Sequence, residues 1–129
     1  MITDSELNNI SGTILDSAIK VHRVLGPGLL ESVYERALAR ELKIRGLSGQ
    51  TQVPISFVYE GEHFDEGFRA DLIVNDSVIV EIKSVEALKD IHKKQLLTYL
   101  KLSNRKIGLL INFNEPLLKD GFVRIVNRL

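Results

Sequence analysis

Three charged residues between positions 71 and 83 have the types and the spacing of a metal-dependent hydrolytic site. Asp71 begins one short apolar run, and Glu81 and Lys83 end the next run two residues apart. Residues two apart on a strand point to the same face, so Glu81 and Lys83 share a face while Ile82 points to the other. Carboxylates are suitable ligands for Mg²⁺ or Mn²⁺, and a lysine beside them could orient an attacking water or stabilise charge on a phosphate.

The register of the hairpin formed by these two runs decides whether the carboxylates meet. A two-residue turn would place the two acids on opposite faces and charge in the apolar face, so we expect a three-residue turn at 75–77. One face is then apolar throughout, formed by Phe68, Ala70, Leu72, Val74, Val78, Val80 and Ile82. The expected cross-strand pairs are Val74 with Val78, Ile73 with Ile79, Asp71 with Glu81, and Arg69 with Lys83.

Two carboxylates that face each other repel unless a cation lies between them. The backbone carbonyl of Ile82 lies near the same point and is a third candidate oxygen ligand. The alternative for so short a motif is an exposed salt-bridge network at a strand end. The cross-strand position of Asp71 favours the metal site.

The composition indicates a globular protein with a single domain, residues 1–129. Lys plus Arg and Asp plus Glu number 17 each, a balance that argues against a strongly electrostatic, non-specific nucleic-acid binder. No apolar run approaches the roughly 20 residues of a membrane span, and the first residues lack the features of a signal peptide. Without cysteine, disulfides and thiolate metal sites are excluded. We expect a cytoplasmic protein with no membrane partner.

The elements that must position the site follow from the periodicity of the apolar residues. They predict an α+β mixed sheet in the order α-α-β-β-β-α-β-β, with an antiparallel meander followed by a crossover helix. Thr3 or Asp4 could cap the first helix, Gly26-Pro27-Gly28 ends it, and a bulge is expected at 65–67. The expected helices span 4–24, 29–45 and 88–102; the expected strands span 52–59, a return strand from 63, the hairpin 68–83, a buried strand 106–113 and an edge strand 121–126.

Several polar residues outside the hairpin could face the same site. Gln95 and Tyr99 lie four apart, in the middle of a stripe on the third helix that also contains Leu88, Ile91 and Leu102. They could offer hydrogen bonds to phosphate or water, or be an edge amide and a core tyrosine. At helix ends, the dipole alone explains three more charged positions: Glu31, His22 and Arg23.

The combined set of motifs resembles the PD-(D/E)XK nuclease superfamily and, more narrowly, the small bacterial and archaeal GxxExxY family. The family motif is present as Gly28-Leu-Leu-Glu31-Ser-Val-Tyr34, and the likeness extends to 22–28, 95–100 and 108–113. It implies a restriction-endonuclease-like core and a metal bound by Glu31, Asp71, Glu81 and the Ile82 carbonyl, with Lys83 as the catalytic lysine and Gln95 beside it. It implies substrate contacts from Tyr34, Tyr99, His22 and Arg23. Ala70 replaces the proline of the superfamily name.

The resulting hypothesis is a Mg²⁺- or Mn²⁺-dependent phosphodiesterase that cleaves DNA or RNA, with DNA favoured. The alternative is an accessory module that keeps the fold and recruits nucleic acid or a protein without cleaving. Because the domain is small, a homodimer or a helicase-like protein partner could help it to hold a nucleic acid. Mg²⁺- or Mn²⁺-dependent turnover separates the two hypotheses.

Overall fold

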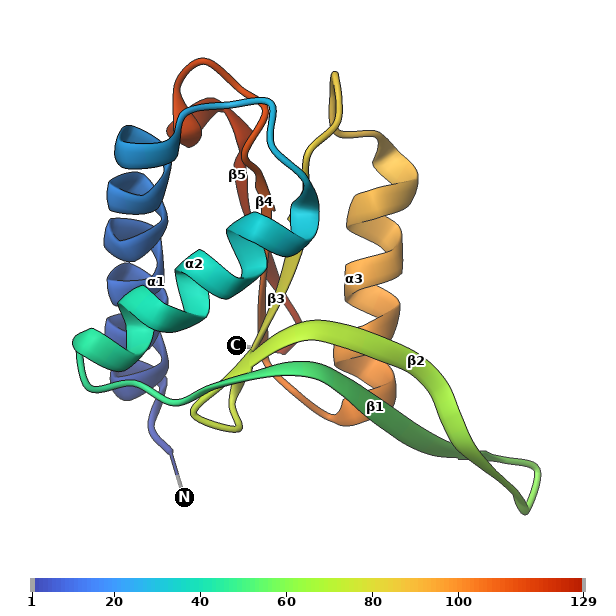
Figure 1. The fold of residues 1–129 in the computed structure, drawn as a ribbon. Coiled ribbons are helices and arrows are strands. Elements are labelled where there is room, and N and C mark those ends of the chain that lie inside the picture. Colours follow the sequence, from blue (N-terminus) through green and yellow to red (C-terminus); the bar gives the residue numbers. More distant parts are fainter. Residues whose placement is uncertain (1, 129) are drawn as a thin grey trace.

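The computed structural model of the protein describes residues 2–128, and their element order is the predicted one (Figure 1). The helices and strands are α1 (Asp4–Leu25), α2 (Glu31–Ile44), β1 (Gly49–Tyr59), β2 (Glu62–Val74), β3 (Val78–Lys83), α3 (Asp90–Ser103), β4 (Ile107–Asn112), the 3-10 helix η1 (Leu118–Gly121) and β5 (Phe122–Val126). Across residues 2–128 there is no helix with the length and apolar character needed to cross a bilayer.

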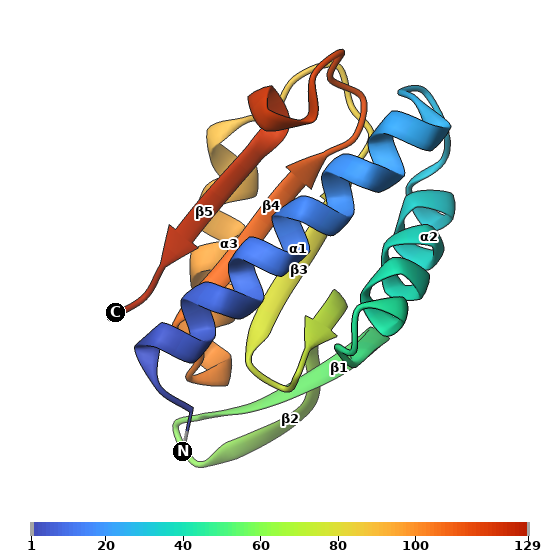
Figure 2. The same cartoon turned by 90° about the vertical axis from the view of Figure 1, so that its left-hand side faces the viewer.

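The strands form one mixed sheet in the order β1-β2-β3-β4-β5. β3 and β4 are parallel and joined by α3, whereas the other neighbouring pairs are antiparallel. Figure 2 shows α1 and α2 on one side of the sheet and α3 behind it. Each face has its own apolar core, one with α1 and α2 and the other with α3. This arrangement confirms the restriction-endonuclease-like α+β core.

Local signals place the helix ends. The Thr3 hydroxyl accepts the Glu6 N–H at 3.1 Å, while the Glu6 carboxylate accepts the Thr3 N–H at 3.3 Å, so α1 begins with a capping box. The second helix begins at Glu31 rather than at 29, and the third begins at Asp90 rather than at 88. Both starts are later than the apolar pattern predicts because the first apolar residues lie in the preceding loop.

The β2–β3 hairpin has the predicted register. Val74 lies opposite Val78, and the Ser77 N–H donates to the Val74 carbonyl at 3.0 Å. Asn75 and Asp76 have φ values of 50° and 54°, a left-handed conformation that Asn and Asp tolerate better than most residues. The three-residue loop is therefore confirmed, and with it the shared face of the two acids.

Beyond the end of the β2–β3 ladder, one register expectation is wrong. Strand pairing between β2 and β3 stops at Leu72 and Val80, and Arg69 instead lies opposite Pro54 of β1. Arg69 also pairs with Glu66 at 2.8 Å. The predicted Arg69–Lys83 pair does not form because β2 leaves β3 at this point to follow β1.

The expectation of one uninterrupted apolar face is also wrong. Phe68 and Ala70 pack in the core on the α3 side, whereas Leu72 packs on the side of α1 and α2. The change of face falls at Asp71. Opposite it in β1, Gln52 has a φ of 51°, and the β1–β2 pairing skips this pair. The bend at Asp71 therefore turns the outer half of the β1–β2 hairpin under α3 (Figure 1).

The bulge expected at 65–67 is confirmed. The register shifts between the Ile55–Phe68 and Phe57–Phe64 pairs, so three β2 residues lie opposite one β1 residue. Gly67 makes this possible: a Cβ there would lie 2.3 Å from the Phe57 ring.

The orientation of α3 differs from the predicted stripe. Leu96 and Leu100 are buried, whereas Gln95 is exposed and Ile91 is 63% exposed. The physical reason is Gly108 on β4, since a Cβ at this glycine would come within 2.8 Å of the Leu96 side chain. The Leu96 side chain occupies the space that a larger residue at position 108 would fill. This contact determines which face of α3 packs on the sheet.

We expect Gly108→Ala to lower the free energy of unfolding by about 1–3 kcal/mol, because the added methyl overpacks the Leu96 contact. The matched control is Gly12→Ala in α1, where a Cβ meets nothing within 4 Å. In this exposed helix interior, alanine should stabilise the protein by about 1 kcal/mol. Urea denaturation followed by circular dichroism measures both. Equal effects would contradict the proposed role of the Gly108–Leu96 contact.

Candidate active site

Asp71 and Glu81 are held by each other's strand at the point where the β2–β3 ladder stops. Glu81 Oε2 accepts the Asp71 N–H at 2.8 Å, and Asp71 Oδ2 accepts the Ile82 N–H at 2.8 Å. Each carboxylate thus replaces a ladder carbonyl and satisfies a backbone donor. The second oxygen of each group does not take part in these two bonds; Asp71 Oδ1 accepts a long hydrogen bond of 3.4 Å from the Gln52 amide.

Both carboxyl groups lie where a negative charge is unfavourable. Glu81 is 7% exposed, and burial, with the nearby Asp71 charge as the second cause, raises its pKa to about 8. Burial also raises the pKa of Asp71. The backbone hydrogen bonds and the positive charge of Lys83 act in the opposite direction on both groups but do not cancel the effect. The nearby positive charge of Lys83 is therefore too weak to offset the burial of the two acids.

Helix α2 adds two further acids to the same place. Glu31 and Glu35 line a hollow of about 190 Å³ together with Gln52, Asp71 and Ile82. Glu31 Oε2 accepts the Ser84 N–H at 3.2 Å, which ties the start of α2 to the end of β3. The charge of Glu31 also contributes to the raised pKa of Asp71. The predicted acids from helix and hairpin are therefore neighbours.

Sequence reasoning missed Glu35 and Gln52. The Gln52 side-chain amide donates to Glu35 Oε1 at 2.5 Å and to Asp71 Oδ1 at 3.4 Å, so it bridges helix and strand. Burial raises the pKa of Glu35. Glu35 could have been found, because it lies four residues after Glu31 and so on the same helix face. Nothing in the sequence distinguishes Gln52, whose place depends on its left-handed φ.

The donor set agrees with a hard divalent cation. Carboxylate oxygens are the ligands that Mg²⁺ and Mn²⁺ prefer, and a cation would offset the repulsion between the buried acids. Across residues 2–128, however, no three His, Cys, Asp or Glu side chains are grouped so as to hold a metal without further ligands. The metal-binding roles of Asp71, Glu81, Glu31 and the Ile82 carbonyl stay predictions.

Tyr99 and Lys83 lie beside the acids, and Gln95 lies one turn away. The Tyr99 ring stacks on Phe68 with centroids 3.9 Å apart. Burial raises the pKa of the Tyr99 hydroxyl, and the charges of Glu81 and Asp71 add to this effect. Gln95 is exposed on α3 four residues before Tyr99, on the same helix face. Their predicted roles toward water or phosphate stay predictions.

Tyr34, His22 and Arg23 lie apart from the acids. Tyr34 is fully buried, and its ring stacks on that of Phe113 with the ring centroids 4.5 Å apart. Its hydroxyl accepts the Leu29 N–H at 3.0 Å and donates to the Gly26 carbonyl at 2.5 Å. The Tyr34 side chain is therefore not exposed to solvent. Its hydroxyl holds the loop that precedes Glu31 and so helps to position Glu31.

A second hollow contains His22 and Arg23. His22 Nε2 donates to the Glu115 carbonyl at 2.7 Å, which joins the end of α1 to the loop after β4. Arg23 lines this hollow with Lys119, and neither residue lines the hollow of Asp71. The structure thus brings Glu31, Asp71, Glu81, Lys83 and Tyr99 together and places His22 and Arg23 elsewhere.

Comparison with known proteins identifies the family to which the chain belongs. A family model described as the PD-(D/E)XK nuclease superfamily matches residues 8–125. A crystal structure of SSO0001 is similar, with a TM-score of 0.53 and 26% sequence identity. The alignment covers 77% of this chain and 51% of that one, so this chain spans about half the length of SSO0001. A search of curated proteins found no match. Since the family match extends over nearly the whole chain and all of the acids described above, the protein belongs to the PD-(D/E)XK nuclease superfamily.

Proposed function

We propose that the protein is a divalent-metal-dependent nuclease that hydrolyses phosphodiester bonds, with DNA favoured over RNA. The observation that carries this proposal is the Asp71–Glu81 pair: two carboxylates side by side, each fixed by a backbone N–H, whose burial the charge of Lys83 does not offset. The motif from Gly28 to Tyr34 supports the narrower GxxExxY assignment.

In this proposal, Asp71 and Glu81 hold Mg²⁺ or Mn²⁺ with help from Glu31 and the Ile82 carbonyl. When bound, the metal supplies a Lewis acid and a water of lowered pKa. Lys83 orients the attacking water and neutralises charge on the phosphate, because it follows Glu81 on the same strand face. Gln95 and Tyr99 donate hydrogen bonds to the substrate.

The test is cleavage of single- and double-stranded DNA and RNA with Mg²⁺ or Mn²⁺ and with chelator. Lys83→Ala should reduce the rate by about 10²–10³-fold, a typical loss for one electrostatic group at a reacting centre. The matched control is Lys101→Ala, an exposed lysine on α3. It should cleave at the wild-type rate. A wild-type protein without turnover in any metal, or a Lys83→Ala variant as active as wild type, would sink the nuclease assignment.

Two observations favour a second candidate, a module that binds nucleic acid or a partner without cleaving. Positive and negative side chains balance at 17 each, and residues 2–128 contain no ready-made group of three metal ligands. In this case a homodimer or a helicase-like partner supplies the additional contacts needed to bind nucleic acid. Salt-dependent binding with no turnover in Mg²⁺ or Mn²⁺ is the result that distinguishes it from the nuclease.

A further inference from the structure

Helix α2 carries a row of cations that the acidic site does not use. Arg36, Arg40 and Lys43 are exposed and spaced four and three residues apart, so they lie on one face of the helix. Among residues 2–128, no carboxylate forms an ion pair with any of the three. Their charges are therefore uncompensated within the described part of the chain.

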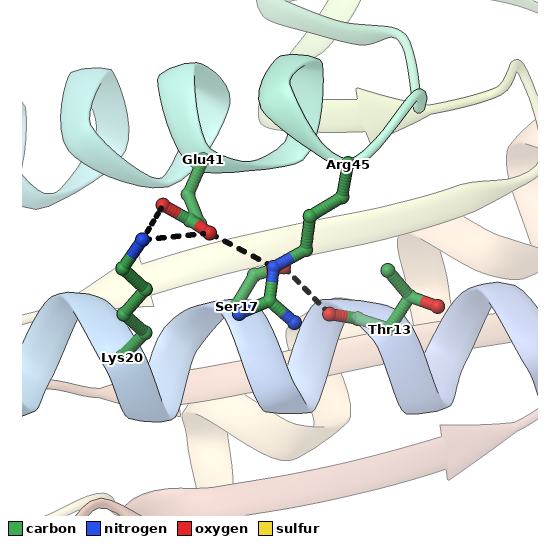
Figure 3. A network of polar contacts seen from close by, with 5 residues as sticks. All are labelled: Thr13, Ser17, Lys20, Glu41 and Arg45. Atoms are coloured by element: carbon green, nitrogen blue, oxygen red, sulfur yellow. Dashed lines mark hydrogen bonds and ion pairs between the residues drawn. The ribbon is translucent and has the colours of Figure 1, made fainter.

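Other cations near α2 are neutralised by one acid. Figure 3 shows Glu41 between Lys20 of α1 and Arg45. Glu41 lies 3.1 Å from Lys20 Nζ and 2.9 Å from Arg45 Nε. Since this acid faces α1, it leaves the row formed by Arg36, Arg40 and Lys43 without a partner.

The row begins at the acidic site. The hollow that contains Asp71 also contains Ser32, and Ser32 borders a second hollow lined by Arg36 and Arg40. Arg40 in turn borders a third hollow, shared with Lys43 and the 46–49 loop. We name the surface formed by Ser32, Arg36, Arg40 and Lys43 the α2 track. It rises about 17 Å along the helix axis.

We propose that the α2 track binds the phosphate backbone of the nucleic-acid strand whose scissile phosphate lies at Asp71 and Glu81. This inference rests on the proposed function and adds a direction to it, from the N-terminus of α2 towards its C-terminus. A duplex strand carries one phosphate per 3.4 Å of axis, so about 17 Å faces roughly five phosphates. Arginine and lysine at these spacings can reach several of them.

Charge complementarity selects a polyanion as the occupant. The cations recur along one line that runs into the site proposed to hold a phosphate, as the repeating backbone of a nucleic acid requires. An acidic protein segment would also match the charge but would have no reason to enter the hollow of Glu31 and Asp71, where the protein itself is acidic. Preferential binding of such a segment over nucleic acid would count against the proposal.

The experiment compares two triple variants with the same change in charge. Arg36→Gln/Arg40→Gln/Lys43→Gln removes the track, and Lys101→Gln/Lys119→Gln/Arg124→Gln removes three exposed cations from other elements. Binding of a fluorescein-labelled 20-nucleotide single strand and duplex is measured in Ca²⁺ over a range of salt concentrations. For the track variant, the slope of log K against log salt should decrease by about 2–3 and the affinity should fall by roughly 10–100-fold. The control should lose less than about 3-fold.

Folding is checked independently. Gln is a good helix former, so the thermal midpoint of the track variant should stay near that of the wild type. If the thermal midpoint falls, the charge-preserving variant Arg36→Lys/Arg40→Lys separates a loss of charge from a loss of folding. It keeps the positive charges and should therefore retain the wild-type salt slope. If the wild type cleaves, the track variant should raise KM by at least about 10-fold with kcat nearly unchanged.

The failure of the track and the failure of the nuclease assignment give different results. A wild type that binds nucleic acid through the track but never cleaves it overturns only the proposed function. Equal salt slopes for the two triple variants overturn the track even if the wild type cleaves. The absence of nucleic-acid binding, or preferential binding of poly-glutamate at the track, overturns it as well.

Discussion

Glu81→Gln is expected to abolish cleavage and, at pH 8, to make the metal-free protein more resistant to heat than the wild type. The activity should fall by about 10²–10³-fold or more, because a carboxylate proposed to hold the metal is lost. The gain in stability has a separate origin. Glutamine keeps an oxygen that can accept the Asp71 N–H, but it never ionises in this buried place.

The sign of the stability effect follows from the pKa of Glu81, which the folded protein raises from 4.5 to about 8. Below pH 4.5 the group is protonated in both the folded and the unfolded state, and the raised pKa has no effect. As the pH rises towards 8, only the unfolded chain loses the proton, so the wild type becomes less stable. Glutamine removes this loss, which at pH 8 amounts to a few kcal/mol, or roughly 10 °C in Tm.

Thermal unfolding at pH 5, 6.5 and 8, with chelator present, tests this prediction. The difference in Tm between Glu81→Gln and the wild type should be small at pH 5 and grow steadily with pH. Glu62→Gln, at an exposed position on β2, is the matched control and should show no such trend. A difference in Tm that does not depend on pH would contradict the assignment of the raised pKa to Glu81.

The affinity of the protein for Mn²⁺ should rise roughly fifty-fold between pH 6 and pH 8. A metal binds the ionised carboxylate, and below a pKa of about 8 most molecules must first release the Glu81 proton. At pH 6.5 the binding of one ion should therefore release about one proton. Bound metal should also raise the Tm of the wild type, and it should do so more strongly at high pH.

Isothermal titration calorimetry in two buffers of different ionisation enthalpy measures both quantities, since the difference between the observed enthalpies gives the number of protons released. Glu81→Gln should bind Mn²⁺ weakly, with little dependence on pH. Asp16→Asn, at an exposed position of α1, serves as the control. An affinity for Mn²⁺ that is constant from pH 6 to pH 8 would rule out Glu81 as a ligand.

The sequence predicts correctly those parts of the fold in which the polarity of a side chain determines whether it faces the core or the solvent. Charge at Asp71 and Glu81 excludes all registers but one, because any other would bury a charge in the core, and the observed Val74–Val78 pair agrees. In the same way, the Gly67 that follows two acids marks the bulge. The burial of β4 on both faces follows from its continuous apolar run.

The predictions are wrong where the position of a side chain depends on contacts with a different element of the fold. The face of α3 depends on the absence of a side chain at Gly108, which favours the Leu96 contact over the predicted Gln95 stripe. The switch of Phe68 to the other core depends on the backbone of Gln52, in a different strand. Glu35 joins the site only because α2 lies across the hairpin end. The contacts of Gly108 and Gln52 leave no periodic pattern in the local sequence, whereas the spacing of Glu31 and Glu35 does.

The two backbone hydrogen bonds made by Asp71 and Glu81 restrict how this site can drift in evolution. Replacement of either acid by alanine leaves the N–H of Ile82 or of Asp71 without its acceptor, at a cost of about 1–3 kcal/mol. Asparagine and glutamine keep the acceptor while losing the charge. A homologue that loses the charges at these positions can therefore keep its fold if Asn replaces Asp71 or Gln replaces Glu81. An Asn or a Gln at these positions would then mark a homologue in which the proposed activity has been lost.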